Sequence, residues 1–240
     1  METYSTINST PTEILEEPFI VMPEKQKSFR EPGYYPDIPS EIKKKHNIYI
    51  LFACKFLKDL YNGNGIKALI LDGREMRTTK ELYFLNDNLK ELKIVEYDPI
   101  TYKELIEKTK NEKKIEIFQT HIYSYVKNFS SPFINVVYFD VISNFFSSKK
   151  TFGTESIIEL FLEKSKVEEI VLAGTFCLRS SFIRNFEEQK KNILVRLEQL
   201  FIKNNFVGKL VIPEKEILYR GQRSCNKSMM FVLYLLNRRK

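Results

Sequence analysis

The sequence predicts an α/β protein with a doubly wound, mostly parallel sheet. Short apolar runs at 68–71, 92–95 and 115–118 alternate with segments of helical character. Continuous apolar runs are typical of parallel strands, because both faces of such strands are buried. The order strand, helix, strand defines a βαβ unit, which is the building block of nucleotide-binding sheets. We therefore expect one α/β domain over residues 41–240, with an extended arm over residues 1–40.

Composition narrows the class of protein. The chain has 240 residues, of which 43% are hydrophobic, so it can form a real core. No apolar run approaches the roughly 20 residues that span a membrane, and the polar, acidic N-terminus does not resemble a signal peptide. Three cysteines (Cys54, Cys177 and Cys225) match neither a zinc pattern nor a disulfide framework, which favours a reducing compartment. We expect a cytoplasmic protein without a metal site or membrane association.

The first 40 residues hold most of the nine prolines and little hydrophobic periodicity. Such a segment is typical of an extended arm. The arm is either anchored to the body by aromatic side chains or a flexible leader, and the sequence leaves both interpretations open. The candidate anchors are Phe19, Phe29, Tyr34 and Tyr35.

A helix is predicted before the first strand. Ser40 is a good N-cap residue, and Asn62-Gly63-Asn64-Gly65 ends the helical pattern. The expected buried stripe consists of Ile48, Phe52, Phe56 and Leu60, which recur at helical spacing. We expect His46 to lie on the exposed basic face of this helix, without a catalytic role.

Acidic residues follow the first two strands. Asp72-Gly73 comes after the first apolar run, and Glu96 ends the second, just before Asp98-Pro99 opens a helix. In a doubly wound sheet, the carboxyl ends of the strands line the ligand crevice. A carboxylate there can accept two hydrogen bonds from a ribose diol, which makes Glu96 a candidate ligand residue. The alternative is that Glu96 and Asp98 are only polar residues where a strand reaches the surface.

The rest of the chain repeats this pattern and then changes. Further strands are expected at 114–118, 133–140 and 167–175, and further helices at 122–128, 154–165 and 182–206. Two final β stretches, 208–219 and 228–237, flank the polar and basic connector 220–227. We interpret this ending as a β-hairpin, whereas a plain dinucleotide-binding fold would continue with parallel strands.

Five βα units closed by a hairpin resemble the class I S-adenosylmethionine-dependent methyltransferases, in which a seventh, antiparallel strand lies between the fifth and the sixth. Residues 95–99, VEYDP, resemble the V-E-x-D-P motif of ribosomal RNA adenine dimethyltransferases, whose Glu binds the ribose hydroxyls. The phrases LDGxxxxTTKxL, VYFD and TFxLR resemble methyltransferase-like proteins of large DNA viruses and protists. The resemblance implies a seven-stranded Rossmann-like sheet and S-adenosylmethionine as cofactor.

The resemblance also implies roles for individual residues. Asp140, at the tip of the fourth strand, would face the methyl group as the catalytic residue, although an Asp there is also a common helix cap or turn former. Thr78 would direct its backbone amide to the cofactor or cap a helix. The residues implied in cofactor binding are Asp72, Gly73, Thr78, Glu96, Asp98, Thr120 and His121.

The sequence departs from the family at the first loop. The family's D-x-G-x-G-x-G is replaced by residues 72–79, which retain one glycine. Glycines there let the backbone approach the ligand closely, so the side chains at 74–76 are expected to crowd the cofactor unless they turn away. The N/D-P-P-Y/F motif of amino methyltransferases is missing after the fourth strand. Spacing identifies no lysine-aspartate-lysine-glutamate set of the ribose 2′-O type.

The net charge of +7 favours a polyanionic partner. Basic residues near the last strands are candidate phosphate contacts, or simply solvated surface: Arg179, Arg220, Arg223 and Lys227. We expect a methyltransferase acting on nucleic acid, with RNA favoured, and a protein subunit as a further partner. The alternative is a catalytically inactive, methyltransferase-like binding or scaffold protein. A nicotinamide-dependent enzyme is disfavoured by the missing G-x-G-x-x-G and by the terminal hairpin.

Overall fold

A computed structural model describes residues 40–129, 132–146, 153–178, 185–219 and 229–240. These residues belong to one compact unit, Pro32–Lys240. The expected arm up to residue 39, with its four candidate anchors, lies outside the described residues. The connector 220–227 lies outside them as well.

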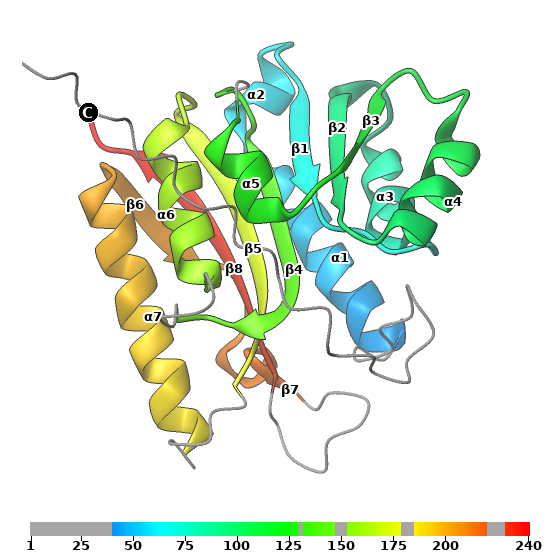
Figure 1. Cartoon of the computed structure of the whole chain (residues 1–240). Coiled ribbons are helices and arrows are strands. Elements are labelled where there is room, and N and C mark those ends of the chain that lie inside the picture. Colours follow the sequence, from blue (N-terminus) through cyan, green and yellow to red (C-terminus); the bar gives the residue numbers. More distant parts are fainter. Residues whose placement is uncertain (1–39, 130–131, 147–152, 179–184, 220–228) are drawn as a thin grey trace, which may run out of the picture. The chain divides into compact units, whose positions relative to one another are not determined.

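Among the described residues, eight strands form one sheet, and seven of them follow the order β3-β2-β1-β4-β5-β8-β6 (Figure 1). The strands β1 to β5 are parallel, and β8 runs antiparallel to both β5 and β6. This arrangement confirms the predicted doubly wound, mostly parallel sheet with an antiparallel C-terminal end. The strands are β1 Ile66–Ile70, β2 Leu89–Glu96, β3 Ile115–Gln119, β4 Val136–Asn144, β5 Glu169–Cys177, β6 Phe206–Leu210, β8 Met229–Arg238 and a two-residue strand, β7 Leu218–Tyr219, which also pairs with β8.

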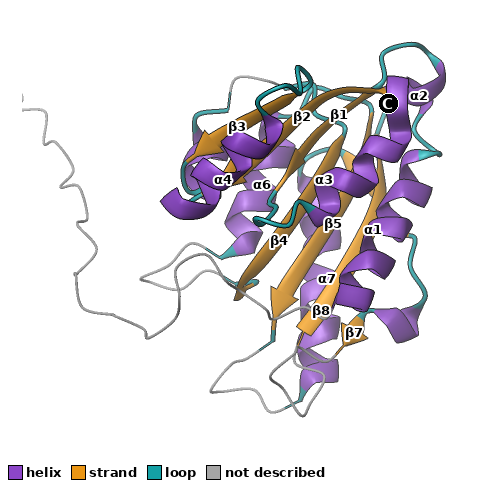
Figure 2. Cartoon of the chain, turned by 90° about the vertical axis from the view of Figure 1, so that its right-hand side faces the viewer, coloured by secondary structure: helices purple, strands orange, loops and turns teal. Residues whose placement is uncertain are grey.

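Helices cover both faces of the sheet. On one face α1 packs against α3, and on the other α5, α6 and α7 form a row (Figures 1 and 2). The α-helices are α1 Ser40–Cys54, α2 Lys58–Tyr61, α3 Arg77–Leu82, α4 Pro99–Thr109, α5 Ile122–Lys127, α6 Thr154–Lys164 and α7 Phe186–Lys203, and the 3-10 helices are η1 Tyr83–Asn88 and η2 Glu214–Glu216.

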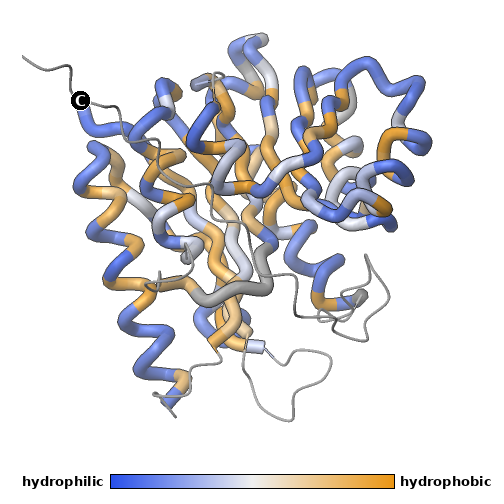
Figure 3. Tube along the Cα trace, in the orientation of Figure 1, coloured by the Kyte–Doolittle hydropathy of each residue, from blue (hydrophilic) through white to orange (hydrophobic). Residues whose placement is uncertain are grey.

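The core lies on both faces of the central strands, which are the most hydrophobic part of the fold (Figure 3). Because side chains alternate along a strand, neighbouring residues of β4 serve opposite faces. Phe139 packs edge-on against Phe161 of α6, with ring centroids 6.0 Å apart. Tyr138 points the other way, where Lys43 of α1 lies 4.1 Å from its ring centroid. The α1 face of β4 therefore carries polar residues as well as apolar ones.

Two strand predictions need correction. The expected strand 208–219 is interrupted after Leu210, because Pro213 lacks a backbone N–H and η2 follows it. The fourth strand does not end at Asp140 but continues to Asn144. Its regular pairing with β5 nevertheless breaks after Asp140, which lies opposite Thr175. Asp140 is thus the last residue of the regular ladder rather than the end of the strand.

The predicted buried stripe of the first helix is wrong for three of its four residues, whereas Leu60 packs against the core. Ile48, Phe52 and Phe56 are 50%, 57% and 54% exposed. His46, expected on the exposed face, is 3% exposed. The helix also ends earlier, at Cys54, and α2 follows as a separate turn. The reason is tertiary: α1 buries a face that carries Ile50, Ala53 and Cys54 beside Lys43, His46 and Asn47, and contact with the rest of the fold selects that face.

Candidate functional site

Predicted site residues from four strands come to one edge of the sheet. In a parallel sheet the carboxyl ends of neighbouring strands share an edge. Glu96, the last residue of β2, pairs with Gln119 of β3. The backbone N–H of Thr120 donates to the Glu96 carbonyl oxygen at 3.2 Å. Asp72 follows β1, and Asp140 lies near the end of β4, the next strand in the sheet.

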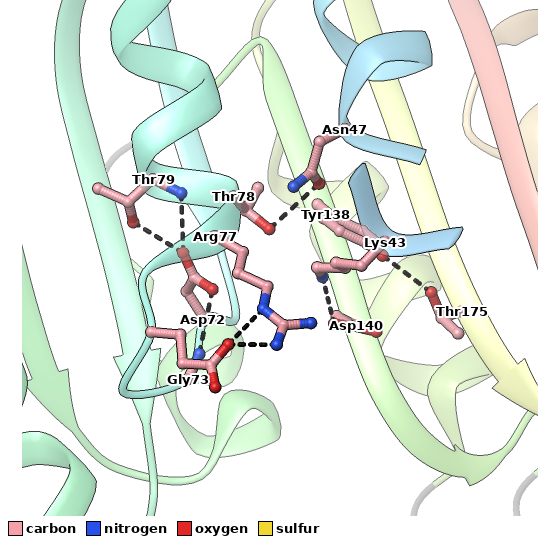
Figure 4. A network of polar contacts seen from close by, with 11 residues as sticks. Lys43, Asn47, Asp72, Gly73, Arg77, Thr78, Thr79, Tyr138, Asp140 and Thr175 are labelled. Atoms are coloured by element: carbon pink, nitrogen blue, oxygen red, sulfur yellow. Dashed lines mark hydrogen bonds and ion pairs between the residues drawn. The ribbon is translucent and has the colours of Figure 1, made fainter. Parts of the chain in front are cut away.

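Asp72 is turned into the protein and holds the start of α3 (Figure 4). Its Oδ2 accepts hydrogen bonds from the Thr79 N–H at 2.8 Å and the Thr79 hydroxyl at 2.9 Å. Its Oδ1 accepts from the Gly73 N–H at 3.1 Å. Burial raises the pKa of Asp72, although Lys43 and Thr79 oppose that effect. Asp72 therefore holds the loop after β1 in place through the hydrogen bonds of its buried side chain.

The glycine-poor loop after β1 leaves open space at Gly73. A Cβ atom placed on Gly73 would meet no atom within 4 Å. Met76 adopts a left-handed conformation with φ 53°, and its backbone N–H closes a turn onto the Gly73 carbonyl oxygen at 2.9 Å. The Met76 side chain is buried in the core, while Glu75 forms an ion pair with Arg77 (Figure 4). Met76 was one of the side chains expected to crowd a ligand, and it is instead buried inside the protein.

The V-E-x-D-P segment forms a tight turn into α4. The Oε1 atom of Glu96 accepts from the Asp98 N–H at 2.7 Å. Asp98 caps α4, because its Oδ2 accepts from the Thr101 N–H at 2.7 Å, with Pro99 in the first turn. Glu96 is half-buried, and that burial, together with the nearby Asp98 and Asp72, raises its pKa. Asp98 is committed to the helix, whereas Glu96 remains at the edge of the sheet.

Two aromatic side chains stand at the ends of β2 and β3. Tyr97 is 70% exposed, and its ring lies edge-on to His121, with centroids 6.1 Å apart. His121 caps α5, because its Nδ1 accepts from the Tyr123 N–H at 3.2 Å. Partial burial lowers the pKa of His121. Neutral aromatic surface therefore borders the edge near Glu96.

Asp140 has a partner that the sequence did not reveal. Lys43 of α1, 97 residues earlier in the chain, donates from Nζ to Asp140 Oδ2 (Figure 4). The two side chains are 6% and 18% exposed. Asp140 Oδ1 is buried without a hydrogen-bond partner. Lys43 belongs to a run of three lysines that reads as ordinary surface, so only its helical phase relative to the sheet identifies it.

Further buried polar residues come from α1 itself and from α3. The Thr78 hydroxyl donates to Asn47 Oδ1 at 3.3 Å, which places Thr78 inside the protein at 1% exposure (Figure 4). The His46 ring stacks on Phe231, with centroids 3.8 Å apart and planes 8° from parallel. Burial lowers the pKa of His46 to about 3, so its imidazole is neutral at physiological pH. Neither His46 nor Asn47 was predicted from the sequence as a residue of the site.

The four basic residues predicted to bind substrate, Arg179, Arg220, Arg223 and Lys227, lie outside the described residues and remain a prediction. Within the described ranges, no group of three or more His, Cys, Asp and Glu residues is arranged to hold a metal ion. No helix in that part of the chain is long and apolar enough to cross a bilayer.

Solved structures share this architecture. The chain is similar to a chain of the fibrillarin/Nop5p complex, with 16% identity over 70% of this chain and 71% of that chain and a TM-score of 0.50. The chain has the fold of the class I methyltransferases. Similarity also extends to a Streptococcus mutans protein in complex with SAH (14% identity, 83% and 99% coverage, TM-score 0.49) and to the 23S rRNA methyltransferase ErmE (16%, 82% and 68%, 0.48). No family model and no curated protein matches the chain, so the resemblance to viral and protist proteins stays a prediction.

Proposed function

We propose that the chain is an S-adenosylmethionine-dependent methyltransferase that acts on nucleic acid, with RNA favoured. The observation that carries the proposal is the half-buried Glu96 carboxylate at the end of β2, next to the open edge at Gly73 after β1. Ligands of doubly wound sheets bind outside the carboxyl ends of the strands. A carboxylate placed there suits the diol of a ribose, to which it can accept charge-assisted hydrogen bonds.

The residues at this edge fit the cofactor. Glu96 would hold its ribose, and Thr120 and His121 would flank its adenine. Gly73 would let it approach the backbone, because nothing occupies the space that a side chain would fill. Asp72, Thr78 and Asp98 would act through the loops and helices that they hold in place. When bound, S-adenosylmethionine supplies an activated methyl group.

Asp140 is our candidate for the catalytic residue. Methyl transfer requires that the accepting atom be aligned and, where it carries a proton, that a neighbouring group take up that proton or its hydrogen bond. Lys43 holds Asp140 Oδ2, which fixes the orientation of the carboxylate, and Oδ1 has no partner. Asp140 Oδ1, although buried, can therefore accept one further hydrogen bond, and we assign that bond to the proton of the group that receives the methyl.

The net charge of +7 supports a polyanionic substrate. Phosphate contacts are assigned to the basic residues near the last strands: Arg179, Arg220, Arg223 and Lys227. Residues 41–240 would form the methyltransferase domain and residues 1–40 an extended arm. Binding to nucleic acid should weaken steeply with salt, because phosphate contacts release counterions. We place the protein in the cytoplasm, with a protein subunit as a further partner.

One observation favours a second function, that of an inactive methyltransferase-like binding or scaffold protein. The loop after β1 retains one glycine, and Met76 occupies a left-handed conformation that costs a non-glycine residue about 1 kcal/mol. The Asp72 carboxylate is also fully used by Gly73 and Thr79. A loop organised around internal bonds would be retained in a protein that no longer accepts the cofactor.

Isothermal titration calorimetry with S-adenosylmethionine and its demethylated product tests the proposal. We expect micromolar binding that disappears in Glu96→Ala. The matched control is Glu116→Ala, which removes the same charge from the neighbouring strand β3, where Glu116 pairs with Lys93 away from the carboxyl end. Binding that survives Glu96→Ala would show that this site is wrongly assigned. A folded protein that binds neither compound would favour the scaffold function.

A further inference from the structure

Three acidic residues follow neighbouring strands of the sheet at the same level. Ile70 of β1 pairs with Ile94 of β2 on one side and with Tyr138 of β4 on the other. Two positions further along the chain from each of these residues comes an acidic one, and we call the three the acidic row: Glu96, Asp72 and Asp140. Neighbouring strands lie about 4.8 Å apart, so the row is about 10 Å long.

Asp72 lies in the middle of the row. The N–H of Leu71 donates to the Tyr138 carbonyl oxygen at 3.3 Å, so the pairing of β1 with β4 continues as far as the residue before Asp72. The charge of Asp140 raises the pKa of Asp72, and the charge of Asp72 raises that of Glu96. Like charges act on each other in this way when they are close. The three carboxylates therefore share one electrostatic environment.

Lys43 of α1 opposes the negative charge of the row. Its Nζ donates to Asp140 Oδ2 (Figure 4), and the two side chains are 6% and 18% exposed. The charge of Lys43 also lowers the pKa of Asp72. Because both partners are largely buried, water screens their charges less than it screens charges at the surface. Lys43 therefore affects the whole row and not only the residue that it contacts.

Three further titratable groups near Asp140 are uncharged at physiological pH. Burial lowers the pKa of His46 to about 3. Burial raises the pKa of the Tyr138 and Tyr219 hydroxyls well above their ordinary value, and the charge of Asp140 raises it further. These groups add no charge to that of Lys43 and Asp140.

The proposed cofactor places a cation at this row. In the proposed site Glu96 holds the ribose, and Asp140 meets the group that receives the methyl. The sulfonium of S-adenosylmethionine joins the ribose to the transferred methyl, so it lies between the two ends of the row. SAH lacks this positive charge. Three carboxylates against one ammonium give the row an excess of negative charge, although the whole chain has a net charge of +7.

We propose that the acidic row makes the site prefer S-adenosylmethionine over SAH, and that Lys43 sets the strength of this preference. This inference rests on the proposed function and makes Lys43 a residue that discriminates between substrate and product. A unit charge about 10 Å away changes the affinity for a cation about twofold in water and about fifteenfold at the effective dielectric constant of a protein site. Weak retention of SAH favours product release, a step that limits turnover in many enzymes.

Opposite charge changes in one ion pair test the proposal. Lys43→Met removes its positive charge and Asp140→Asn its negative charge, so each variant is the structural control of the other. Lys93→Met is a further control, because the Lys93 side chain is 9% exposed and pairs with Glu91 and Glu116, outside the row. Isothermal titration calorimetry at pH 8 gives the dissociation constants of S-adenosylmethionine and SAH for each protein. Circular dichroism confirms that each protein is folded.

We expect Lys43→Met to raise the ratio of the SAH to the S-adenosylmethionine dissociation constant by about twofold to fifteenfold, and Asp140→Asn to lower it by a similar factor. The double variant should restore the wild-type ratio, and Lys93→Met should leave it unchanged. Structural damage from the broken ion pair acts on both ligands and is common to both single variants. A ratio that moves in the same direction in both, or in neither, therefore overturns the proposal.

The wild-type protein provides a test that requires no variant to fold. It should bind S-adenosylmethionine more tightly than SAH, and equal or tighter binding of SAH overturns the proposal. Failure of the proposed function is recognised separately, because the folded wild-type protein then binds neither compound.

Discussion

His46 makes the stability of the protein depend on pH in a calculable way. Burial lowers the pKa of its imidazole to about 3 from an ordinary value of 6.5. Between these values the unfolded chain binds a proton that the folded protein does not, so stability falls as the pH falls below 6.5. Each pH unit in that window is worth about 1.4 kcal/mol. At pH 5 the loss relative to pH 7 is therefore about 2 kcal/mol of unfolding free energy.

Urea unfolding followed by circular dichroism, at pH 7 and pH 5, measures this term in the wild type and in His46→Phe. Phenylalanine is neutral at both pH values and can keep the stacking on Phe231. The charged groups that act on His46, namely Asp140, Lys43 and Lys45, are present in both proteins. Burial raises the pKa of Asp72 and of Glu96, so their contributions are lost as pH rises, and these also cancel in the comparison.

We expect the wild type to lose about 2 kcal/mol more than His46→Phe between pH 7 and pH 5. The variant should therefore gain relative stability on acidification. Equal losses in the two proteins would show that His46 takes up its proton in the folded state as readily as in the unfolded chain. The description of α1 as a helix that buries a neutral histidine would then be wrong.

Two further predictions concern the stability of the protein at the two ends of β4. Lys43→Met should lower the free energy of unfolding in denaturant by about 2 kcal/mol, which is less than for a fully buried pair because Asp140 is partly exposed. The double variant Lys43→Met/Asp140→Asn should recover part of that loss. Strictly additive effects of the two substitutions would refute the coupling between the two residues. Asn135→Ala should lower the free energy of unfolding by about 2–3 kcal/mol, because Asn135 is 2% exposed and its amide makes three hydrogen bonds. Its Oδ1 accepts from the Lys67 N–H at 2.9 Å, and its Nδ2 donates to Asp59 Oδ2 and to the Gly65 carbonyl oxygen, both at 3.0 Å. This site is at the amino end of β4, so affinity for SAH should not change, and a changed affinity in a folded variant would contradict the separation of the two edges.

Most of the fold was predictable because it follows from local patterns. The apolar runs of β1, β2 and β3 identify buried strands wherever they lie in space. Asp98-Pro99 marks the start of α4 through a local cap, in which the Asp98 side chain accepts from the Thr101 N–H three residues later. The antiparallel position of β8 between β5 and β6 followed from the family resemblance rather than from the pattern itself. The interruption at Pro213 was missed because the apolar residues on either side of it, 210–212 and 217–219, favour strands.

The residues of the candidate site likewise fall into those that local patterns identify and those that only the fold reveals. Glu96, Asp72 and Asp140 were found because they follow apolar runs, and the edge of a parallel sheet collects the residues that end its strands. Lys43, His46, Asn47 and Tyr219 were not found, and His46 was assigned to solvent. The positions of Lys43, His46 and Asn47 depend on the rotation of α1 about its own axis against the sheet, which no nearby residue determines, and Tyr219 lies in a strand of only two residues, β7.

The sequence by itself thus determined the order of the strands along the chain, the start of α4 at Asp98-Pro99 and the acidic residues that follow the strands, because each rests on neighbours within a few residues. The tertiary structure alone decided which face of α1 is buried. Its apolar residues Ile48 and Phe52, and Phe56 just beyond its end, are exposed, while Lys43 lies against Asp140. The buried face of α1 carries Ile50, Ala53 and Cys54 beside Lys43, and it is defined only when the helix meets residues distant in the chain.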